Sequence, residues 1–252
     1  MEKIRFEKDD RAYRIVLDDP PLHILDIAML EELREALRAV ENDRALLLIS
    51  SSGGKTFSAG ASVHDHMGDR VKAMLAAFHD CFRILDRLEL VTVSLVQGAA
   101  LGGGAELAFA ADFVLASSRA KFGQPEINLG VFPPVAAYQL SRQLPPRRGL
   151  ELLLTGDPIG ADEALRLGLV NSVFPEADFD AKSAEWLARL HKQSSSSMRL
   201  TKRAFRLASE SDFAEKLARV EALYLDELMQ TADAVEGLEA FVEKRPPSWK
   251  GR

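Results

Sequence analysis

The sequence has little cysteine, no long apolar run and no excess of basic residues, and each shortage excludes a class of protein. Cys81 is the single cysteine among 252 residues, which leaves no intramolecular disulfide and no cysteine-based zinc site. No stretch approaches the ~18 apolar residues of a membrane-spanning helix, and no basic segment followed by an apolar one opens the chain. We therefore expect a cytoplasmic protein with no membrane partner.

The charge balance argues against nucleic acid as a partner. The formal net charge is −6, whereas nucleic-acid-binding domains are typically basic. Hydrophobic residues make up 47% and charged residues 28% of the chain, both ordinary for a globular protein. The length suits one large domain, or a domain with an appendage.

The first part of the chain alternates predicted strands and helices. Tyr13, Ile15 and Leu17 alternate as in a strand, and the apolar run 45–49 is typical of a buried strand in a covered sheet. Apolar residues at helical spacing predict one helix after Asp26 as N-cap and another over 71–88. This alternation indicates an α/β fold.

After about residue 145 the pattern becomes mostly helical. The run Ser194–Ser197 predicts a short break, and Asp212 and Glu215 have the spacing of a capping box. We divide the chain there into a core of residues 1–193 and a C-terminal helical region of residues 194–252. The pattern leaves open whether the last helices assemble subunits or pack on their own chain. Helices are predicted over 147–155, 161–167, 179–191, 198–209, 213–230 and 232–243.

Two glutamates stand in segments marked by glycine or proline. Glu106 follows Gly102-Gly103-Gly104-Ala105, and Glu126 follows Gly123-Gln124-Pro125. Consecutive glycines let a ligand approach bare amides, here at the start of a helix predicted over 105–111. Amides that stabilise an oxyanion, beside carboxylates that move protons, indicate an enzyme. The glycines could instead serve only a tight turn; neither a P-loop nor a dinucleotide fingerprint is present.

His64 and His66 are the one histidine pair that suggests a metal site. No cysteine and no third ligand at helical spacing accompanies them, so we interpret them as loop histidines and expect no metal. Cys81 lies on the apolar face of its predicted helix and is expected in the core.

Several segments, in this order, resemble the enoyl-CoA hydratase/isomerase (crotonase) family. The resemblance covers nearly the whole chain and implies a crotonase-like spiral of β-β-α units with a C-terminal helical oligomerisation region. It also implies a homotrimer or a dimer of trimers, an acyl-CoA thioester as substrate, and no cofactor beyond the coenzyme A that enters with the substrate. The segments are Phe57-Ser58-Ala59-Gly60-Ala61, residues 97–106, Phe122-Gly123-Gln124-Pro125-Glu126 and residues 155–171.

The resemblance implies roles for individual residues. The N–H groups of Ala61 and Gly103 would hold the thioester oxygen, while Glu106 activates water and Glu126 exchanges the proton at carbon. Two carboxylates favour hydration, or its reverse, over isomerisation. Contacts to the adenine and phosphates of coenzyme A could come from residues 64–68 or the basic tail 244–250. The residues expected to line the substrate site are Ala59, Gly60, His64, Gly102, Gly104, Pro133 and Pro134.

Two departures from the family pattern concern the pocket. Ser62 stands where hydratases commonly have aspartate, and residues 133–137 read Pro-Pro-Val-Ala-Ala in place of a glycine-rich stretch. Pro134 has no N–H to offer, and the larger side chains should reshape the acyl pocket. The sequence is most similar to the cyclohexa-1,5-diene-1-carbonyl-CoA hydratases of anaerobic aromatic degradation. A straight-chain enoyl-CoA hydratase, an isomerase, a thioester hydrolase, a decarboxylase, or a non-catalytic acyl-CoA- or RNA-binding relative stay open as alternatives.

Overall fold

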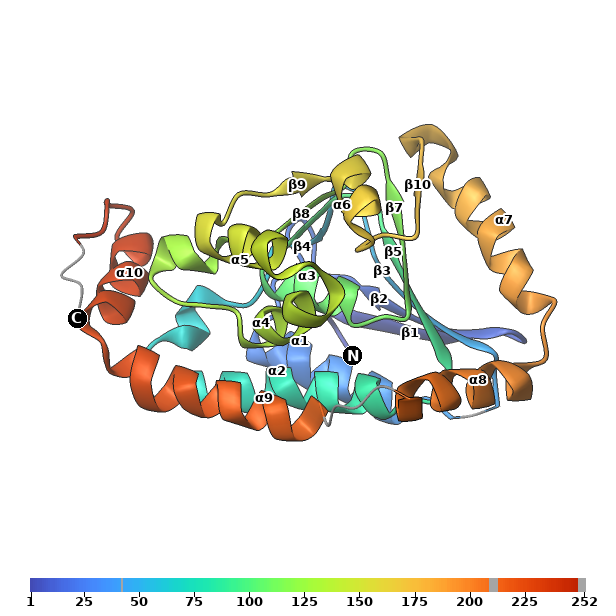
Figure 1. The fold of residues 1–252 in the computed structure, drawn as a ribbon, viewed down its shortest axis with the longest axis horizontal. Coiled ribbons are helices and arrows are strands. Elements are labelled where there is room, and N and C mark those ends of the chain that lie inside the picture. Colours follow the sequence, from blue (N-terminus) through green and yellow to red (C-terminus); the bar gives the residue numbers. More distant parts are fainter. Residues whose placement is uncertain (42, 209–212, 249–252) are drawn as a thin grey trace.

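The computed structural model describes residues 1–41, 43–208 and 213–248, which form two β-sheets enclosed by helices (Figure 1). The larger sheet has the strand order β1-β2-β3-β5-β7-β10 and the smaller one β4-β6-β8-β9. β1 and β9 pair antiparallel with their neighbours, and the other pairs are parallel. The larger sheet comprises Ile4–Lys8, Ala12–Leu17, Leu46–Ser51, Val91–Val96, Phe113–Ser117 and Ser172–Phe174; the smaller comprises Thr56–Ser58, Ala99–Leu101, Lys121–Gly123 and Ile159–Gly160.

The chain winds through both sheets in repeated turns. β3, β5 and β7 each pass to a short strand of the smaller sheet, namely β4, β6 and β8. A helix or short helical turn follows each short strand. Ser58 pairs with Ala100, and Leu101 pairs with Gly123, so the carboxyl ends of these parallel strands meet at one edge. The segments that follow the three strands are therefore neighbours in space, although β4 and β6 begin 43 residues apart and β6 and β8 begin 22 residues apart.

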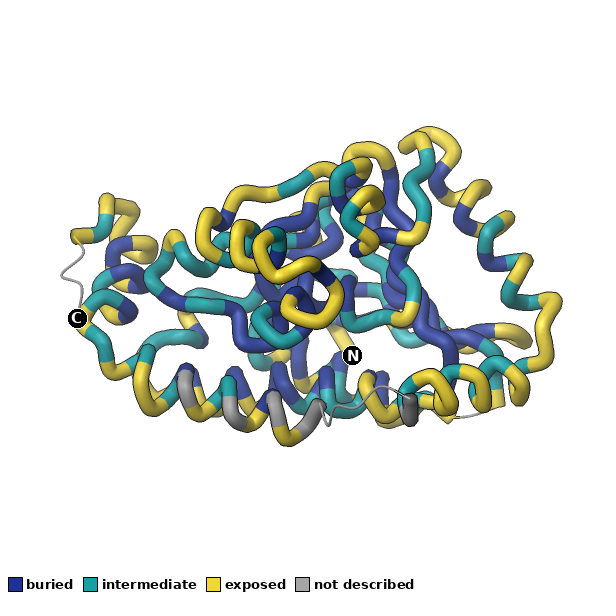
Figure 2. Tube along the Cα trace, in the orientation of Figure 1, coloured by how far each residue is buried: buried dark blue, intermediate teal, exposed yellow. Residues whose placement is uncertain are grey.

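Helices cover the sheets and enclose a large hydrophobic core and a smaller one, whose residues are among the buried ones shown dark blue in Figure 2. Asp26 caps α1, as predicted, and accepts a hydrogen bond from the Met29 N–H at 2.8 Å. α2 packs against α1 with its apolar face, and Cys81 is fully buried there as expected. The helices of this part are α1 (Ile27–Arg38), η1 (Val63–His66), α2 (Arg70–Arg87), α3 (Gly103–Phe109), η2 (Pro125–Leu129), α4 (Pro134–Gln143), α5 (Pro146–Thr155) and α6 (Ala161–Leu167).

Three helix boundaries differ from the prediction. α3 begins at Gly103 rather than at Ala105, because the glycines themselves form its first turn. The predicted break is present but lies at residues 192–194, and Ser195 rather than residue 198 opens α8, since small polar residues suit a first helical turn. The helix predicted over 213–230 divides into α9, a π-helical turn and a 3-10 turn, while Asp212 of the predicted capping box lies outside the described residues. The C-terminal elements are η3 (Glu176–Asp178), α7 (Phe179–His191), α8 (Ser195–Ala208), α9 (Phe213–Ala222), η4 (Leu223–Glu227), η5 (Leu228–Gln230) and α10 (Ala232–Val242).

The last helices pack on the core of their own chain. α9 lies along α2 and α4, and α10 contacts η1 and η2 (Figure 1). Tyr224, in the π-helical turn, is buried with its ring 5.2 Å from that of Phe132, edge to face. Of the two roles left open by the sequence, packing is therefore observed, and assembly stays a prediction. No helix in the described ranges is long and apolar enough to cross a membrane.

Candidate active site

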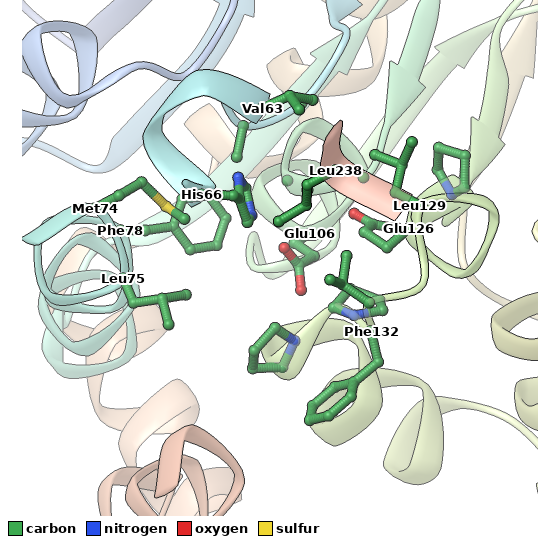
Figure 3. Close-up of a pocket in the computed structure, with 18 of the residues that line it drawn as sticks. Val63, His66, Met74, Leu75, Phe78, Glu106, Glu126, Leu129, Phe132 and Leu238 are labelled. Atoms are coloured by element: carbon green, nitrogen blue, oxygen red, sulfur yellow. The ribbon is translucent and has the colours of Figure 1, made fainter. Parts of the chain in front are cut away.

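A cavity of about 400 Å³ opens where β4, β6 and β8 end (Figure 3). Its walls come from the three segments that follow these strands, from α2, and from α10 at the far end of the sequence. Glu106 and Glu126 are among the few polar side chains on an otherwise apolar wall. The lining residues are Ala59, Gly60, Ala61, Val63, His66, Met74, Leu75, Phe78, Gly102, Gly103, Glu106, Pro125, Glu126, Asn128, Leu129, Val131, Phe132, Pro133, Pro134, Leu238 and Phe241.

The backbone amides of Ala61 and Gly103 lie beside each other on this wall. An added Cβ at Gly103 would stand 3.2 Å from the Ala61 nitrogen, which shows how closely the two segments approach. Leu25 ties the backbone around Ala61, because its N–H donates to Gly60 and its carbonyl accepts from Ser62. Gly103 is the first residue of α3 and so has no partner within the helix. Throughout the described ranges, neither amide donates a hydrogen bond to another protein group.

Gly102 brings the Glu126 carboxylate close to these amides. Its φ of +51° and ψ of −128° belong to a region that side chains rarely adopt, and the turn directs the chain from β6 into α3. A Cβ at Gly102 would stand 2.4 Å from Oε1 of Glu126, so only glycine leaves room for the carboxylate. Glu126 itself is held by η2, whose first residue is Pro125.

Glu106 reaches the cavity from α3 and is 2% exposed. Its Oε1 accepts a hydrogen bond of 2.6 Å from the N–H of Ala136, the third residue of α4. The carboxylate therefore faces the positive end of that helix. Pro134 lacks an N–H, as the sequence indicated, but it occupies the first helical position, where proline fits well. An amide two residues further on supplies the contact.

Burial is the main influence on both carboxyl groups. It raises the pKa of Glu106 well above the usual range, the charge of Glu126 raises it further, and the Ala136 amide opposes the shift. Burial likewise raises the pKa of Glu126, whose Oε2 has no hydrogen-bond partner in the described part of the chain. Two neighbouring carboxylates in one buried site retain a proton between them. Near neutral pH the pair can thus offer one acid and one base.

The rest of the cavity suits an apolar group. Met74, Leu75 and Phe78 face it from α2, and Leu238 faces it from α10 (Figure 3). Phe241 of α10 also lines it. Such a surface excludes water and strengthens the electrostatic interactions of the two glutamates.

Most of the residues expected at the substrate site meet at this cavity, but two do not. Gly104 packs on β4 instead, because a Cβ there would stand 2.4 Å from the Ser58 carbonyl oxygen. His64 is exposed and lies outside the lining, whereas His66 lines the cavity. The alternating positions of the two histidines marked this segment as a candidate for the site. Only the path of η1 decides that His66, and not His64, faces the cavity. Nowhere in the described residues do three or more His, Cys, Asp or Glu side chains cluster as metal ligands would.

Comparison with known proteins identifies relatives of the whole chain. Residues 7–252 match the family model described as enoyl-CoA hydratase/isomerase. The cyclohexa-1,5-dienecarbonyl-CoA hydratase of Thauera aromatica is 42% identical, over 99% of this chain and 97% of its own. The crotonyl-CoA hydratase of Syntrophomonas wolfei is 35% identical, over 97% and 96%. A solved enoyl-CoA hydratase from Mycobacterium avium subsp. paratuberculosis superimposes with a TM-score of 0.87, at 25% identity and 98% coverage of both chains. The expected crotonase-like α/β fold with C-terminal helices is confirmed.

Proposed function

We propose that this chain, which belongs to the enoyl-CoA hydratase/isomerase family, is an acyl-CoA hydratase. It would add water to an α,β-unsaturated or conjugated dienoyl thioester. The observation that carries this proposal is the meeting, at one apolar cavity, of the buried Glu106 carboxyl group, the half-buried Glu126 carboxyl group and two amides that have no hydrogen-bond acceptor among the described residues. Membership of the family indicates a thioester substrate. The two amides can polarise its carbonyl group, and the two carboxyl groups can move two protons.

The thioester carbonyl oxygen would lie between the N–H groups of Ala61 and Gly103. As water attacks the β-carbon, negative charge moves onto this oxygen and an enolate forms. Each amide donor aimed at that charge contributes on the order of 10²–10³ in rate. Glu106 would take a proton from the attacking water, and Glu126 would deliver one to the α-carbon. The shared proton suits this division, because one carboxyl group must be charged while the other is protonated.

We propose cyclohexa-1,5-diene-1-carbonyl-CoA as the substrate. The relative from Thauera that carries this substrate in its name is the more similar of the two hydratases compared. Pro133 and Pro134 lie on the cavity wall, where the family pattern has smaller residues. They therefore change the shape of the space that is available to the acyl group. The apolar faces of Leu75, Phe78 and Phe132 suit the flat, hydrophobic ring of a diene.

The experiment that tests the proposal is a mass-resolved product assay of the purified protein. Crotonyl-CoA and cyclohexa-1,5-diene-1-carbonyl-CoA are offered in parallel. A product heavier by one water from the diene, with little from crotonyl-CoA, supports both the reaction and the substrate. Hydration of crotonyl-CoA alone supports the reaction and contradicts the substrate. An unchanged mass with a moved double bond, or a shortened acyl group, contradicts hydration itself.

The two glutamates provide the matched variants for this assay. Glu106→Gln and Glu126→Gln each keep the side-chain volume and remove one acid–base group. Each is expected to lower kcat by roughly 10²–10⁴-fold. Full turnover in both variants would refute the assigned roles.

We further propose that the enzyme is cytoplasmic and forms a trimer or a dimer of trimers, with residues 194–252 as the assembly region. Leu200 and Phe205 support this: they are 62% and 75% exposed on α8 in the single chain, and an interface between subunits would cover them. Light scattering coupled to size exclusion gives the mass of the assembly. A monomer at micromolar concentration would contradict the proposal.

A further inference from the structure

His66 is a polar side chain on the cavity wall to which the reaction assigns no part. It lies on η1, five residues after Ala61, and its imidazole points from η1 into the cavity (Figure 3). The side chain is half-buried and lines the cavity. Its neighbours on that wall are apolar, including Val63, Met74 and Phe78. A polar group in such surroundings costs free energy unless a ligand satisfies it.

The imidazole is held in one tautomer. Its Nδ1 lies 2.8 Å from the carbonyl oxygen of Ser62. A carbonyl oxygen can only accept, so Nδ1 carries the hydrogen and Nε2 of the neutral ring has a free lone pair. In the described part of the chain, Nε2 has no hydrogen-bond partner of its own.

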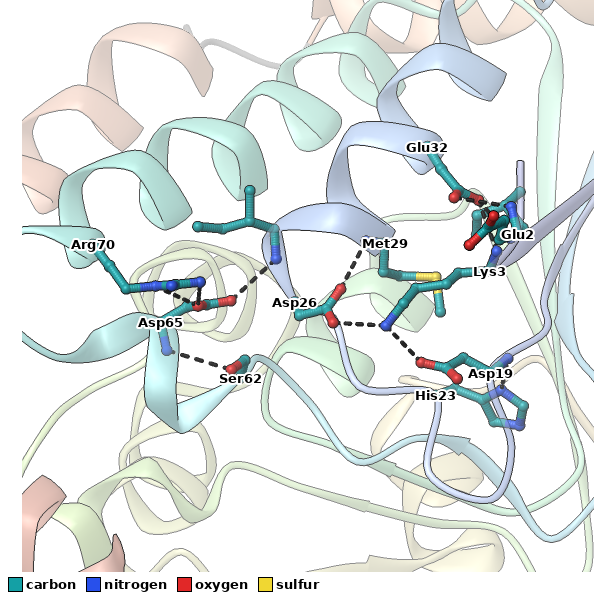
Figure 4. Close-up of polar contacts among 12 residues, drawn as sticks. Glu2, Lys3, Asp19, His23, Asp26, Met29, Glu32, Ser62, Asp65 and Arg70 are labelled. Atoms are coloured by element: carbon teal, nitrogen blue, oxygen red, sulfur yellow. Dashed lines mark hydrogen bonds and ion pairs between the residues drawn. The ribbon is translucent and has the colours of Figure 1, made fainter.

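The turn that carries His66 is fixed by a polar network (Figure 4). The Ser62 hydroxyl caps η1 by accepting from the Asp65 N–H at 3.3 Å. Asp65 is buried, and its carboxylate accepts from the Ile27 N–H at 3.1 Å and from Nε of Arg70 at 2.9 Å. η1 is thereby tied to the start of α1 and of α2. A ring on so constrained a turn is preorganised to bind a ligand.

The surroundings of His66 suit a hydrogen-bond acceptor rather than a base or a metal ligand. Burial lowers the pKa of the imidazole below its usual range, and this effect outweighs the hydrogen bond to the Ser62 carbonyl and the charge of Asp65, which both raise it. Within the described ranges no cluster of further ligands accompanies it. A neutral nitrogen with one lone pair needs a single donor from the ligand.

We propose that His66 is a specificity-determining residue that accepts a hydrogen bond, at Nε2, from a hydroxyl group on the acyl part of the bound thioester. The site then takes hydroxylated acyl-CoA molecules in preference to equally large ones without a hydroxyl. This inference rests on the proposed function in one respect, namely that the acyl group occupies this cavity. The hydroxyl has two sources: the one that hydration places on the β-carbon, or one that the acyl group already carries further along.

Binding of non-reacting aromatic thioesters tests the proposal without turnover. Benzoyl-CoA and its 2-, 3- and 4-hydroxy derivatives are titrated calorimetrically into the wild-type protein and three variants. His66→Met keeps the bulk and removes the acceptor, while His66→Gln keeps an acceptor at a similar reach. His64→Gln makes the same change at the exposed histidine two residues away. Because no product is formed, failure of the hydration assay and failure of this inference are separate results.

In the wild type, at least one hydroxylated ligand should bind about three- to tenfold more tightly than benzoyl-CoA, the gain from one net hydrogen bond. His66→Met should abolish that preference, and His66→Gln and His64→Gln should retain most of it. A preference for the 2-hydroxy ligand identifies the hydroxyl formed by hydration; a preference for the 3- or 4-hydroxy ligand identifies one already present.

Two results would overturn the proposal. One is equal binding of all four ligands by the wild type. The other is a uniform loss of affinity in His66→Met, including benzoyl-CoA, which indicates a structural role or a contact to coenzyme A. If His66→Met does not fold, as judged by its thermal transition, His66→Leu takes its place, with the same two results decisive.

Discussion

Substitution of Gly102 by alanine should disable the site while leaving the fold intact. The new Cβ would stand 2.4 Å from Oε1 of Glu126, where ordinary contact begins at 3.4 Å. The carboxylate must therefore retreat by about 1 Å, and a misplacement of this size can lower the rate by about 10²-fold. The backbone at φ +51° and ψ −128° adds a strain of about 1–3 kcal/mol. We expect kcat to fall about 100-fold or more, with a modest loss in the free energy of unfolding.

Gly168→Ala separates the two effects. Gly168 also has a positive φ, +82°, at the end of α6, but an added Cβ there meets nothing within 4 Å. Its cost should be about 1–2 kcal/mol of stability from the left-handed backbone alone, with kcat unchanged.

The assay is steady-state hydration by both variants, beside urea titrations that measure the free energy of unfolding. Equal kcat values for Gly102→Ala and Gly168→Ala would refute the reasoning. That result would mean either that the Glu126 carboxylate moves without consequence or that its position is not needed for turnover.

Three further predictions concern the glutamate pair and the η1 turn. Burial raises the pKa of Glu126 in the folded state, so the folded state is favoured at acidic pH and loses stability as the pH rises through that pKa and the buried group becomes charged. Glu126→Gln removes this charge. Calorimetry should therefore show a higher Tm for the variant at about pH 9 but not at about pH 4. Asp65→Ala should lower the free energy of unfolding by about 1–3 kcal/mol in urea titrations, because the Ile27 N–H loses its acceptor. Arg70→Ala should lower it by less than about 1 kcal/mol, because the Arg70 side chain is exposed. Equal losses in the two variants would contradict this reasoning. Ser62→Ala should lower the free energy of unfolding by about 0.5–2 kcal/mol, because η1 loses its N-cap. Ser62→Asp can also cap the turn and should retain both stability and activity. An alanine variant as stable as the wild type would count against the cap.

The sequence was sufficient for much of the fold because its signals are local. The apolar run of β3, the Asp26 cap of α1 and the amphipathic face of α2 each depend on nearby residues, and each is found as predicted. The π-helical turn at Tyr224 was not predictable, since it depends on packing against Phe132, 92 residues earlier. Nor did composition reveal that the serines of 195–197 open a helix.

The site divides in the same way. Its residue types and their spacing, with glycines before Glu106 and a proline before Glu126, were readable because the chemistry requires those residues in those turns. Which groups face one cavity was decided by three parallel strand ends that meet at one edge, a long-range arrangement that no local pattern contains. The same arrangement sends His66 inward and His64 outward, assigns Gly104 to packing, and gives the Ala136 amide to Glu106. The sequence by itself thus determined the chemical groups and the family, and the tertiary structure alone decided which of those groups meet, because burial and contact depend on residues far apart in the chain.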